Sequence, residues 1–179
     1  MIWDQDLYIK AWRFAADAHL GQTVPGTDIP YLNHLGNVAM EVMSAVAETE
    51  VADPNLAVQA ALLHDTIEDT ACDYASINEV FGQPVADGVQ ALSKNPEAGD
   101  KKAQMQDSLA RIRLQPKEIW MVKLADRITN LQAPPQHWSL EKAVRYRDEA
   151  QMILDALGEA NTLLAARLEA KIENYKQYC

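Results

Sequence analysis

The stretch Ala61–Thr70, which reads ALLHDTIEDT, decides the fold of this chain and points to its chemistry. An apolar segment leads directly into four side chains that can bind a metal or move a proton: His64, Asp65, Glu68 and Asp69. In a helix, Glu68 lies one turn beyond His64, and the same spacing relates the two aspartates. Because desolvating unpaired carboxylates is costly, a purely structural helix has little reason to place them behind an apolar run. The pattern therefore indicates a functional cavity.

The composition favours a single helical domain. The chain has 179 residues, enough for one domain with a substantial core, and we expect one domain over residues 1–179. Hydrophobic residues make up 48% and charged residues 23%, which is ordinary for a globular protein. Strong helix formers are plentiful and only seven glycines occur, so the predicted fold class is all-α.

The charge and the termini limit the partners. The net charge of −10 argues against DNA or RNA, whose binders normally carry a basic face. A small phosphorylated ligand remains compatible, since a metal and a few local cations can hold it. The sequence contains neither a signal peptide nor an apolar run near the roughly 20 residues that span a bilayer. With only Cys72 and Cys179 and no disulfide framework, we expect a cytoplasmic protein without a membrane partner.

The apolar periodicity predicts a helical bundle without strands or internal repeats. Asp53 and Pro54 form a typical helix start, with the aspartate as N-cap and the proline at the first helical position. Residues 20–30 hold two glycines and two prolines and should form a loop. Helices are expected over residues 4–19, 33–48, 54–69, 74–92, 101–114, 139–157 and 159–176. The segment 74–92 should be interrupted at residues 81–84, and a further helix should begin at residue 116 and end at residues 133–135.

Potential metal ligands come from three separate segments. His34 lies where a loop enters a helix, and His64 stands beside Asp65. Asp126 lies inside an apolar helical segment, where an ion pair with Lys123 or Arg127 is the alternative explanation. A single histidine is more often a core or surface residue than a ligand, but the combined set suits a divalent metal with nitrogen and oxygen ligands. The candidate ligands are His34, His64, Asp65 and Asp126.

Three motifs in consistent order carry a family resemblance. They are Tyr31–His34 (YLNH), His64–Thr70 (HDTIEDT) and Lys123–Leu131 (KLADRITNL). They resemble the HD superfamily of metal-dependent phosphohydrolases, and more narrowly its alarmone-hydrolase branch, which comprises the hydrolase domain of RelA/SpoT proteins and related small stand-alone hydrolases. The resemblance runs from about residue 11 to 157, and His19–Gln22 (HLGQ) also fits this branch. It implies an HD-type helical bundle.

The resemblance also implies a reaction. In that family Mn²⁺ is the typical metal, although another divalent transition metal stays open, and its four ligands fall at the candidate positions named above. The substrate is a purine nucleotide with a 3′-pyrophosphate, usually ppGpp or pppGpp, the alarmones of the stringent response. Water attacks the 3′-linked phosphate, which releases pyrophosphate and leaves GDP or GTP. Glu68 and Asp69 are the candidates for orienting that water or taking its proton, and their individual roles stay open.

Candidate substrate contacts follow from the same resemblance, each beside a simpler explanation. Asn130 matches a family position that contacts the nucleotide, but it is equally well explained as a helix-surface amide. Lys142 and Tyr146, one turn apart, resemble residues that contact phosphate and ribose, although an amphipathic helix face explains them nearly as well. Lys94 is placed to reach the pyrophosphate, or is a solvated loop lysine.

One segment departs from the family pattern. Relatives typically carry an Arg and a Lys or Ser shortly after the Gly-Gln, and the arginine stacks on the base. Gly21–Asp28 (GQTVPGTD) contains no cation, so a stacking contact of about 1 kcal/mol is missing. The sequence therefore leaves the base open, and an adenine alarmone is an alternative to a guanine one. The number of 5′-phosphates and the oligomeric state stay open as well.

Two other functions are compatible with the motifs. Another HD-type nucleotidase or phosphodiesterase would share the metal ligands, but such enzymes generally lack the adjacent Glu-Asp pair. A non-catalytic nucleotide-sensing module built on a decayed HD fold would normally have lost a ligand, and none is lost here. The nature of the products distinguishes the first alternative, and the absence of metal-dependent turnover would support the second.

Overall fold

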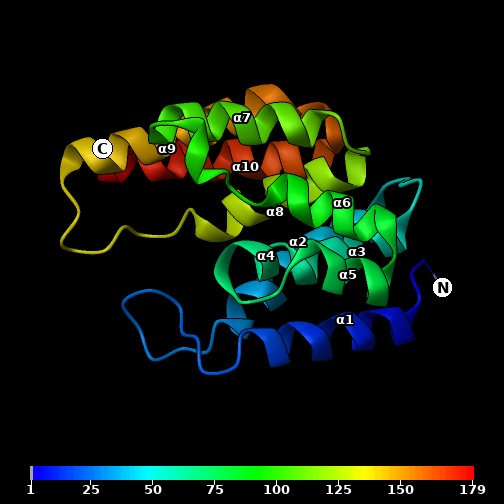
Figure 1. The fold of residues 1–179 in the computed structure, drawn as a ribbon. Helices are drawn as coiled ribbons and strands as arrows, with labels where there is room; N and C mark the ends of the chain where they lie inside the picture. The colour runs from blue at the N-terminus through cyan, green and yellow to red at the C-terminus, as the bar shows by residue number, and fades with distance from the viewer. Residues whose placement is uncertain (1) are drawn as a thin grey trace.

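The computed structural model describes residues 2–179 as an assembly of helices (Figure 1). Within these residues the only β-type pairing is an isolated bridge between Thr23 and Pro30, so the all-α prediction is confirmed. The α-helices are α1 (Gln5–Ala18), α2 (Leu32–Glu48), α3 (Pro54–Leu63), α4 (Thr66–Asp69), α5 (Tyr74–Phe81), α6 (Gln83–Leu92), α7 (Lys101–Arg113), α8 (Lys117–Asn130), α9 (Leu140–Leu157) and α10 (Thr162–Tyr175).

Several helices begin where local capping chemistry dictates. The carboxylates of Asp4, Asp53, Asp73 and Asp100 accept hydrogen bonds from amides in the first turn of α1, α3, α5 and α7. Each such cap satisfies an amide that has no partner within the helix, which typically stabilises the helix by about 1 kcal/mol. These starts lie within one residue of the positions predicted from the sequence.

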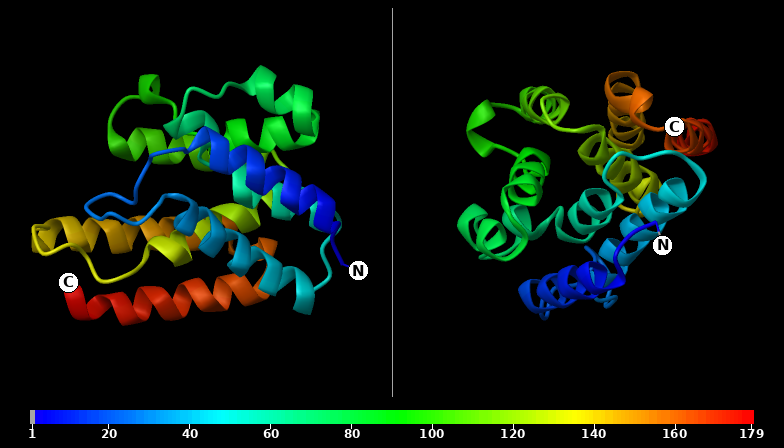
Figure 2. Two further views of the ribbon diagram at one scale, coloured as in Figure 1. Left: turned by 90° about the horizontal axis from the view of Figure 1, so that it is seen from below. Right: turned by 90° about the vertical axis from the view of Figure 1, so that its right-hand side faces the viewer.

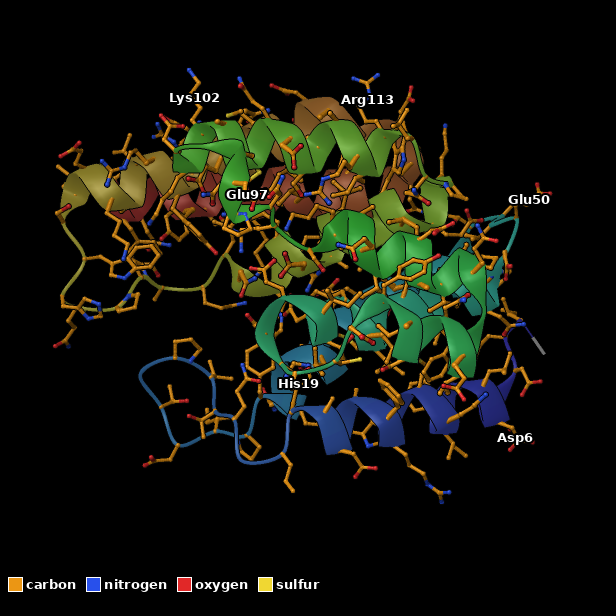
Figure 3. All side chains as sticks on the ribbon, in the orientation of Figure 1. Asp6, His19, Glu50, Glu97, Lys102 and Arg113 are labelled. Carbon is orange, nitrogen blue, oxygen red and sulfur yellow. The ribbon has the colours of Figure 1, made fainter. Side chains whose placement is uncertain are left out.

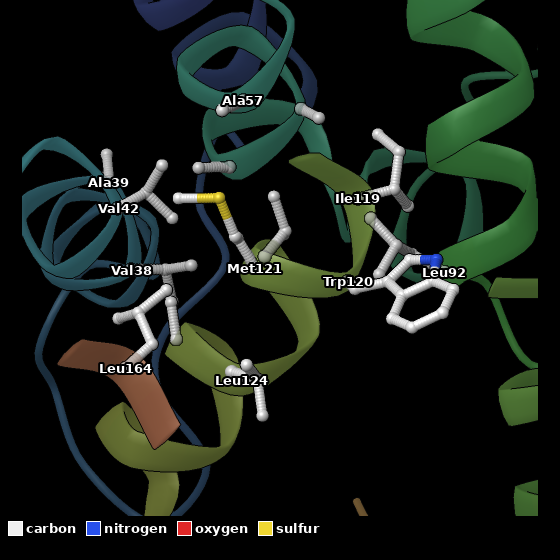
Figure 4. Close-up of a cluster of buried hydrophobic side chains, with 14 of the residues drawn as sticks. Val38, Ala39, Val42, Ala57, Leu92, Ile119, Trp120, Met121, Leu124 and Leu164 are labelled. Carbon is white, nitrogen blue, oxygen red and sulfur yellow. The ribbon is translucent and has the colours of Figure 1, made fainter. Parts of the chain in front are cut away.

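The core lies where α2, α3 and α8 meet (Figure 4). Every residue of α3 from Leu56 to Leu63 is buried, because α1, α2, α6 and α8 pack around it. Met121 of α8 lies between the side chains of α2 and Ala57 of α3, while Leu124 of α8 and Leu164 of α10 lie at the end of the cluster away from Ala57 (Figure 4). Burying one such side chain contributes about 1.5–3 kcal/mol, so α3 and α8 are firmly fixed supports for anything at their ends.

The remaining helices cover this core from two sides. The views of Figure 2 show α9 and α10 running alongside each other, while α5, α6 and α7 lie on the other side of α8. Gly88 lets α6 approach α8 closely, since a Cβ there would lie 2.3 Å from Cδ1 of Ile119. Among the described residues, no helix is long and apolar enough to cross a membrane.

Two expected helix ends are wrong. The helix expected over residues 54–69 stops at Leu63, and the chain turns at His64 and Asp65 before the single turn of α4 begins. The helix expected to reach the break at 133–135 ends at Asn130. At the first end, His64 and Asp65 contact residues far away in the sequence, which local patterns do not report. At the second end, Asn130 bonds back to Asp126 within α8, and Leu131 leaves the helical backbone conformation.

Candidate metal centre and active site

Four predicted ligands from three parts of the chain converge on one point. His34 comes from the first turn of α2, His64 and Asp65 from the bend after α3, and Asp126 from α8. The two Nε2 atoms lie 3.3 Å apart, and Asp65 Oδ2 lies 3.0 Å from Nε2 of His64 and 3.4 Å from Nε2 of His34. Oδ1 of Asp126 lies 3.5 Å and 3.9 Å from the same nitrogens of His34 and His64. All four side chains are largely buried.

The donor set fits a divalent cation. Nδ1 of His64 donates to the carbonyl oxygen of Ala61 at 2.9 Å, which leaves the lone pair of Nε2 facing the centre. Such a bond from the second ring nitrogen is the usual way in which proteins orient a metal-binding histidine. Ligand atoms of His34, His64 and Asp126 all lie within 4.8 Å of one another. Two imidazoles with two carboxylates suit a transition metal of mixed nitrogen and oxygen ligation.

The buried carboxylates favour a positive charge at the centre of the site. Burial lowers the pKa of His64, but the carboxylates of Asp65 and Asp126 outweigh this and raise it to about 9. Burial raises the pKa of Asp65, yet the imidazoles and the Tyr31 hydroxyl hold it well below its usual range. The pKa of Asp126 is lowered as well, because Lys123 and His64 outweigh the effect of burial. A proton on His64 thus occupies the role that a metal cation would fill.

Asp126 also bonds to its own helix. Its Oδ2 accepts from Nζ of Lys123 at 3.1 Å, and its Oδ1 accepts from Nδ2 of Asn130 at 2.5 Å. Of the two ion-pair partners considered from the sequence, Lys123 is therefore the one in contact. Arg127 points to α9 instead, where its guanidinium lies 4.3 Å from the ring of Tyr146. The ion-pair and metal-ligand explanations of Asp126 are therefore compatible, because it pairs with Lys123 and also faces the imidazoles.

A cavity of about 190 Å³ is lined by three of the predicted ligands, His64, Asp65 and Asp126. Glu68 and Asp69 line it together with Lys94, Lys123 and Asn130. Glu68 accepts hydrogen bonds from the backbone amide of Lys94 at 2.9 Å and from its Nζ at 2.5 Å. Burial, followed by Asp65 and Glu68, raises the pKa of Asp69, so this carboxyl holds a proton more readily than a free aspartate.

The predicted substrate contacts divide into two groups. Lys94 and Asn130 line the cavity, so Lys94 is not a loop lysine directed only at solvent. Lys142 and Tyr146 lie on α9 outside the cavity lining, grouped around Trp138. Nζ of Lys142 lies 3.9 Å from the centre of the Trp138 ring, and the ring of Tyr146 packs edge-on to it at 5.2 Å. The substrate roles of all four residues stay predictions.

Sequence reasoning missed two residues of the site. Tyr31 opens the motif YLNH but received no role, and Lys123 was considered only as an ion-pair partner. The Tyr31 hydroxyl donates to Oδ2 of Asp65 at 2.6 Å. Burial and the adjacent carboxylates raise the pKa of Tyr31, which keeps this donor protonated. The sequence did offer one signal for these two residues. Tyr31 lies three residues before His34, and Lys123 lies three residues before Asp126, which places each on the same helix face as a predicted ligand.

Comparison with known proteins agrees with this geometry. A family model described as an HD domain matches residues 11–163. The chain belongs to the HD domain family. Membership of this family implies a divalent metal, and the donor set described above fits one.

Two stand-alone relatives in this family are similar along nearly their whole length. The guanosine-3′,5′-bis(diphosphate) 3′-pyrophosphohydrolase MESH1 of Danio rerio is 32% identical over 168 residues, covering 90% of this chain and 89% of that protein. MESH1 of Xenopus tropicalis is 31% identical and covers 93% of each chain. These relatives confirm the predicted alarmone-hydrolase branch of the HD family.

A solved structure shows the same fold. It is described as a metazoan ortholog of SpoT that hydrolyzes ppGpp, and it superposes with a TM-score of 0.80 over 94% of both chains at 24% identity. At that identity the likeness concerns the fold alone. It confirms the HD-type helical arrangement that the motifs predicted.

Proposed function

We propose that this chain is a Mn²⁺-dependent hydrolase that removes the 3′-pyrophosphate from alarmone nucleotides. It would convert ppGpp to GDP and pppGpp to GTP, with pyrophosphate as the second product. The observation that carries the proposal is one cavity in which His64, Asp65 and Asp126 meet the Glu68–Asp69 pair. His34 lies directly behind them, with its Nε2 3.4 Å from Oδ2 of Asp65. Similarity to two MESH1 3′-pyrophosphohydrolases over about nine tenths of the chain supports the substrate class. Such a substrate and two unpaired cysteines suit the cytoplasm.

The proposed metal ligands are His34, His64, Asp65 and Asp126. When bound there, Mn²⁺ would lower the pKa of a water molecule and neutralise charge on the phosphoryl oxygens. The residues of the chain prepare the site for it. The Ala61 carbonyl fixes the ring of His64, and the Tyr31 hydroxyl and Lys123 hold the two carboxylates in place.

Glu68 and Asp69 are proposed to handle the attacking water. Both lie in the cavity beside Asp65 without being part of the ligand set. Asp69 has a raised pKa, so its carboxylate accepts a proton more easily than an exposed aspartate does. Lys94 binds both oxygens of Glu68 and keeps that side chain at the cavity wall. Glu68 or Asp69 would take a proton from the water, whose oxygen forms a bond to the 3′-linked phosphorus. The bond between that phosphorus and the 3′-oxygen breaks, and the 3′-oxygen takes up the proton, which leaves pyrophosphate and a free 3′-hydroxyl.

The cations of the cavity are proposed to hold the pyrophosphate. Lys94 and Lys123 are the two lysines that line the cavity; Lys94 follows α6 and Lys123 lies on α8. Asn130, at the end of α8, offers an amide to the nucleotide. Tyr146 and Lys142 on α9 would contact the ribose and phosphates from outside the cavity, as the family resemblance implies.

The proposal leaves the base of the nucleotide open. Gly21–Asp28 holds no cation to stack on a guanine, so adenine alarmones stand beside guanine ones as substrates. A nucleotidase or phosphodiesterase acting on another small nucleotide is the alternative function within the same family. Those reactions release orthophosphate or a nucleoside monophosphate instead of pyrophosphate.

The test is a substrate panel with Mn²⁺, scored by product identity. It contains ppGpp, pppGpp, pppApp, 3′-nucleotides and simple nucleoside triphosphates, with the Asp65→Ala variant as control. We expect pyrophosphate from the 3′-pyrophosphorylated nucleotides alone, and none from the variant. Absence of pyrophosphate from every such nucleotide would refute the proposal, and orthophosphate from 3′-nucleotides would favour the alternative.

A further inference from the structure

Asp65 behaves differently from the aspartates that begin α1, α3, α5 and α7. Those four carboxylates each accept a hydrogen bond from an amide of the helix they precede. Asp65 occupies the same position before α4, yet its side chain makes no capping bond. Capping is the usual preference of an aspartate at this position. The backbone of Asp65 is helical, with φ −99° and ψ −2°, whereas an N-cap backbone is usually extended. Its carboxylate is therefore directed by contacts with other segments.

Tyr31 supplies one such contact. Its hydroxyl donates to Oδ2 of Asp65 at 2.6 Å, and this is the oxygen that lies 3.0 Å from Nε2 of His64. A hydrogen bond to an ionised carboxylate is about twice as strong as one between neutral groups. The ring of Tyr31 also lies 5.3 Å from the ring of His34, one helical turn further along the chain. Tyr31 thus contacts a predicted ligand on each side of the centre.

The ring of Tyr31 stacks on the ring of His19. The two rings are stacked with their centres 5.0 Å apart and their planes inclined by 23°. His19 lies at the end of α1 (Figure 3), is 5% exposed, and has its Nδ1 bonded to Oε1 of Gln22 at 2.6 Å. Gly21 permits the tight turn between them, because it adopts a φ of 80°. The stacked His19 ring restricts rotation of the phenol ring away from Asp65.

Backbone bonds join the two ends of the loop that carries these residues. The amide of Tyr31 donates to the carbonyl of Gln22 at 2.9 Å, and that of Val24 donates to the carbonyl of Ile29 at 2.8 Å. The residues beside His19 and Tyr31 are therefore fixed relative to each other, while residues 25–28 form the tip. The segment Gly21–Asp28, which lacks cations, and the residues that support Tyr31 therefore belong to the same loop.

From this geometry we propose that Tyr31 is a positioning residue for the metal centre. Its hydroxyl would direct the Asp65 carboxylate toward the metal and away from the α4 amides, and His19 and Gln22 would keep the phenol ring in place. The inference rests on the proposed metal site. It assigns a role to the ends of the loop that differs from recognition of the base.

The test measures Mn²⁺ affinity without any nucleotide, using electron paramagnetic resonance of free Mn²⁺. Tyr31→Phe removes only the hydroxyl. Tyr74→Phe is the matched control, since the Tyr74 hydroxyl donates to Oδ1 of Asp87 at 2.8 Å outside the metal centre. Outer-shell partners of metal ligands typically contribute about 10–100-fold to affinity. We therefore expect Tyr31→Phe to weaken Mn²⁺ binding at least about tenfold and Tyr74→Phe to leave it unchanged, with similar melting temperatures for the two metal-free variants.

The outcomes separate this inference from the proposed function. If the parent chain binds Mn²⁺ and Tyr31→Phe binds it within twofold of the parent, the positioning role is refuted and the metal site stands. If the parent binds no Mn²⁺, both proposals fail. Should Tyr31→Phe not fold, His19→Leu provides the second variant, because it keeps the hydroxyl and removes the stacked ring. Weaker Mn²⁺ binding by folded His19→Leu supports the inference, and unchanged binding overturns it.

Discussion

The two ends of α3 are built from similar residues and behave in opposite ways. At its start, Asp53 accepts a hydrogen bond from the amide of Leu56 at 2.9 Å, and Pro54 occupies the first helical position. At its end, neither a glycine nor a capping side chain stops the helix, and His64 retains helical backbone angles. The chain bends there, and Asp65 faces His34 of α2 while His64 faces Asp126 of α8.

The difference shows what distinguishes a structural end from a functional one. At the start of α3, the side-chain cap itself is local, since Asp53 Oδ1 accepts from the amide of Leu56. Within residues 2–179, the only distant bond to Asp53 is made by its backbone amide, which donates to Oε1 of Glu118 at 2.8 Å. The end is stabilised by residues more than 30 positions away in either direction, such as Tyr31 and Asp126. Four polar side chains brought together by a buried apolar scaffold are costly unless they bind something. We therefore expect substitutions at the first end to affect stability, and those at the second to affect metal binding and turnover.

The largest effect is expected from Asp65→Ala. It removes a proposed metal ligand together with the acceptor of the Tyr31 hydroxyl, so metal and activity should be lost together. The measurements are the metal content of the purified protein and the release of pyrophosphate. A variant that retains both Mn²⁺ and turnover would show that Asp65, at the end of α3, is neither a metal ligand nor required for catalysis.

The next effect is expected from Glu68→Gln combined with Asp69→Asn. These changes keep the shape of the cavity but remove both candidate proton acceptors. Turnover should fall by roughly 10²–10⁴-fold, while Mn²⁺ affinity stays close to that of the parent. The two measurements together decide the role of these carboxylates. Near-normal turnover would show that Glu68 and Asp69 are not catalytic, and loss of Mn²⁺ would show that they belong to the metal site.

A smaller effect is expected from pH. The Asp65 and Asp126 carboxylates outweigh burial and raise the pKa of His64 to about 9, so below that pH Mn²⁺ must displace a proton from the imidazole. The apparent Mn²⁺ affinity should therefore rise by up to about tenfold per pH unit and level off near the pKa. Titrations between about pH 6 and pH 8.5 follow this directly. An affinity that is constant over this range would contradict the charge balance described for the site.

The smallest effect is expected from Asp53→Ala at the other end of the helix. Loss of this N-cap should lower the free energy of unfolding by about 1 kcal/mol, which corresponds to roughly 2–4 °C in melting temperature for a chain of this size. Mn²⁺ affinity and turnover should not change. Thermal unfolding and a Mn²⁺ titration of the same sample test both statements, and a loss of metal binding would end the distinction between the two ends.

The same distinction explains what the sequence could reveal. The start of α3 was predicted to the residue, because an aspartate followed by proline is a local signal. The bend at His64 was missed, since the bonds that fix it come from α2 and α8. The four candidate ligands could be proposed because histidines are rare in this chain and the motif order resembles a known family. Tyr31 and Lys123 escaped notice because their partners become visible only once the helices are packed.

The most direct test of the central claim is hydrolysis of ppGpp in ¹⁸O-labelled water with Mn²⁺. Attack of water on the 3′-linked phosphorus predicts one ¹⁸O atom in each released pyrophosphate and none in the GDP, with the label absent from the Asp65→Ala reaction and present for Asp53→Ala. Mass spectrometry of both products reads this out. Release of labelled orthophosphate, or label in the nucleotide, would contradict the claim that the bend after α3 serves 3′-pyrophosphate hydrolysis.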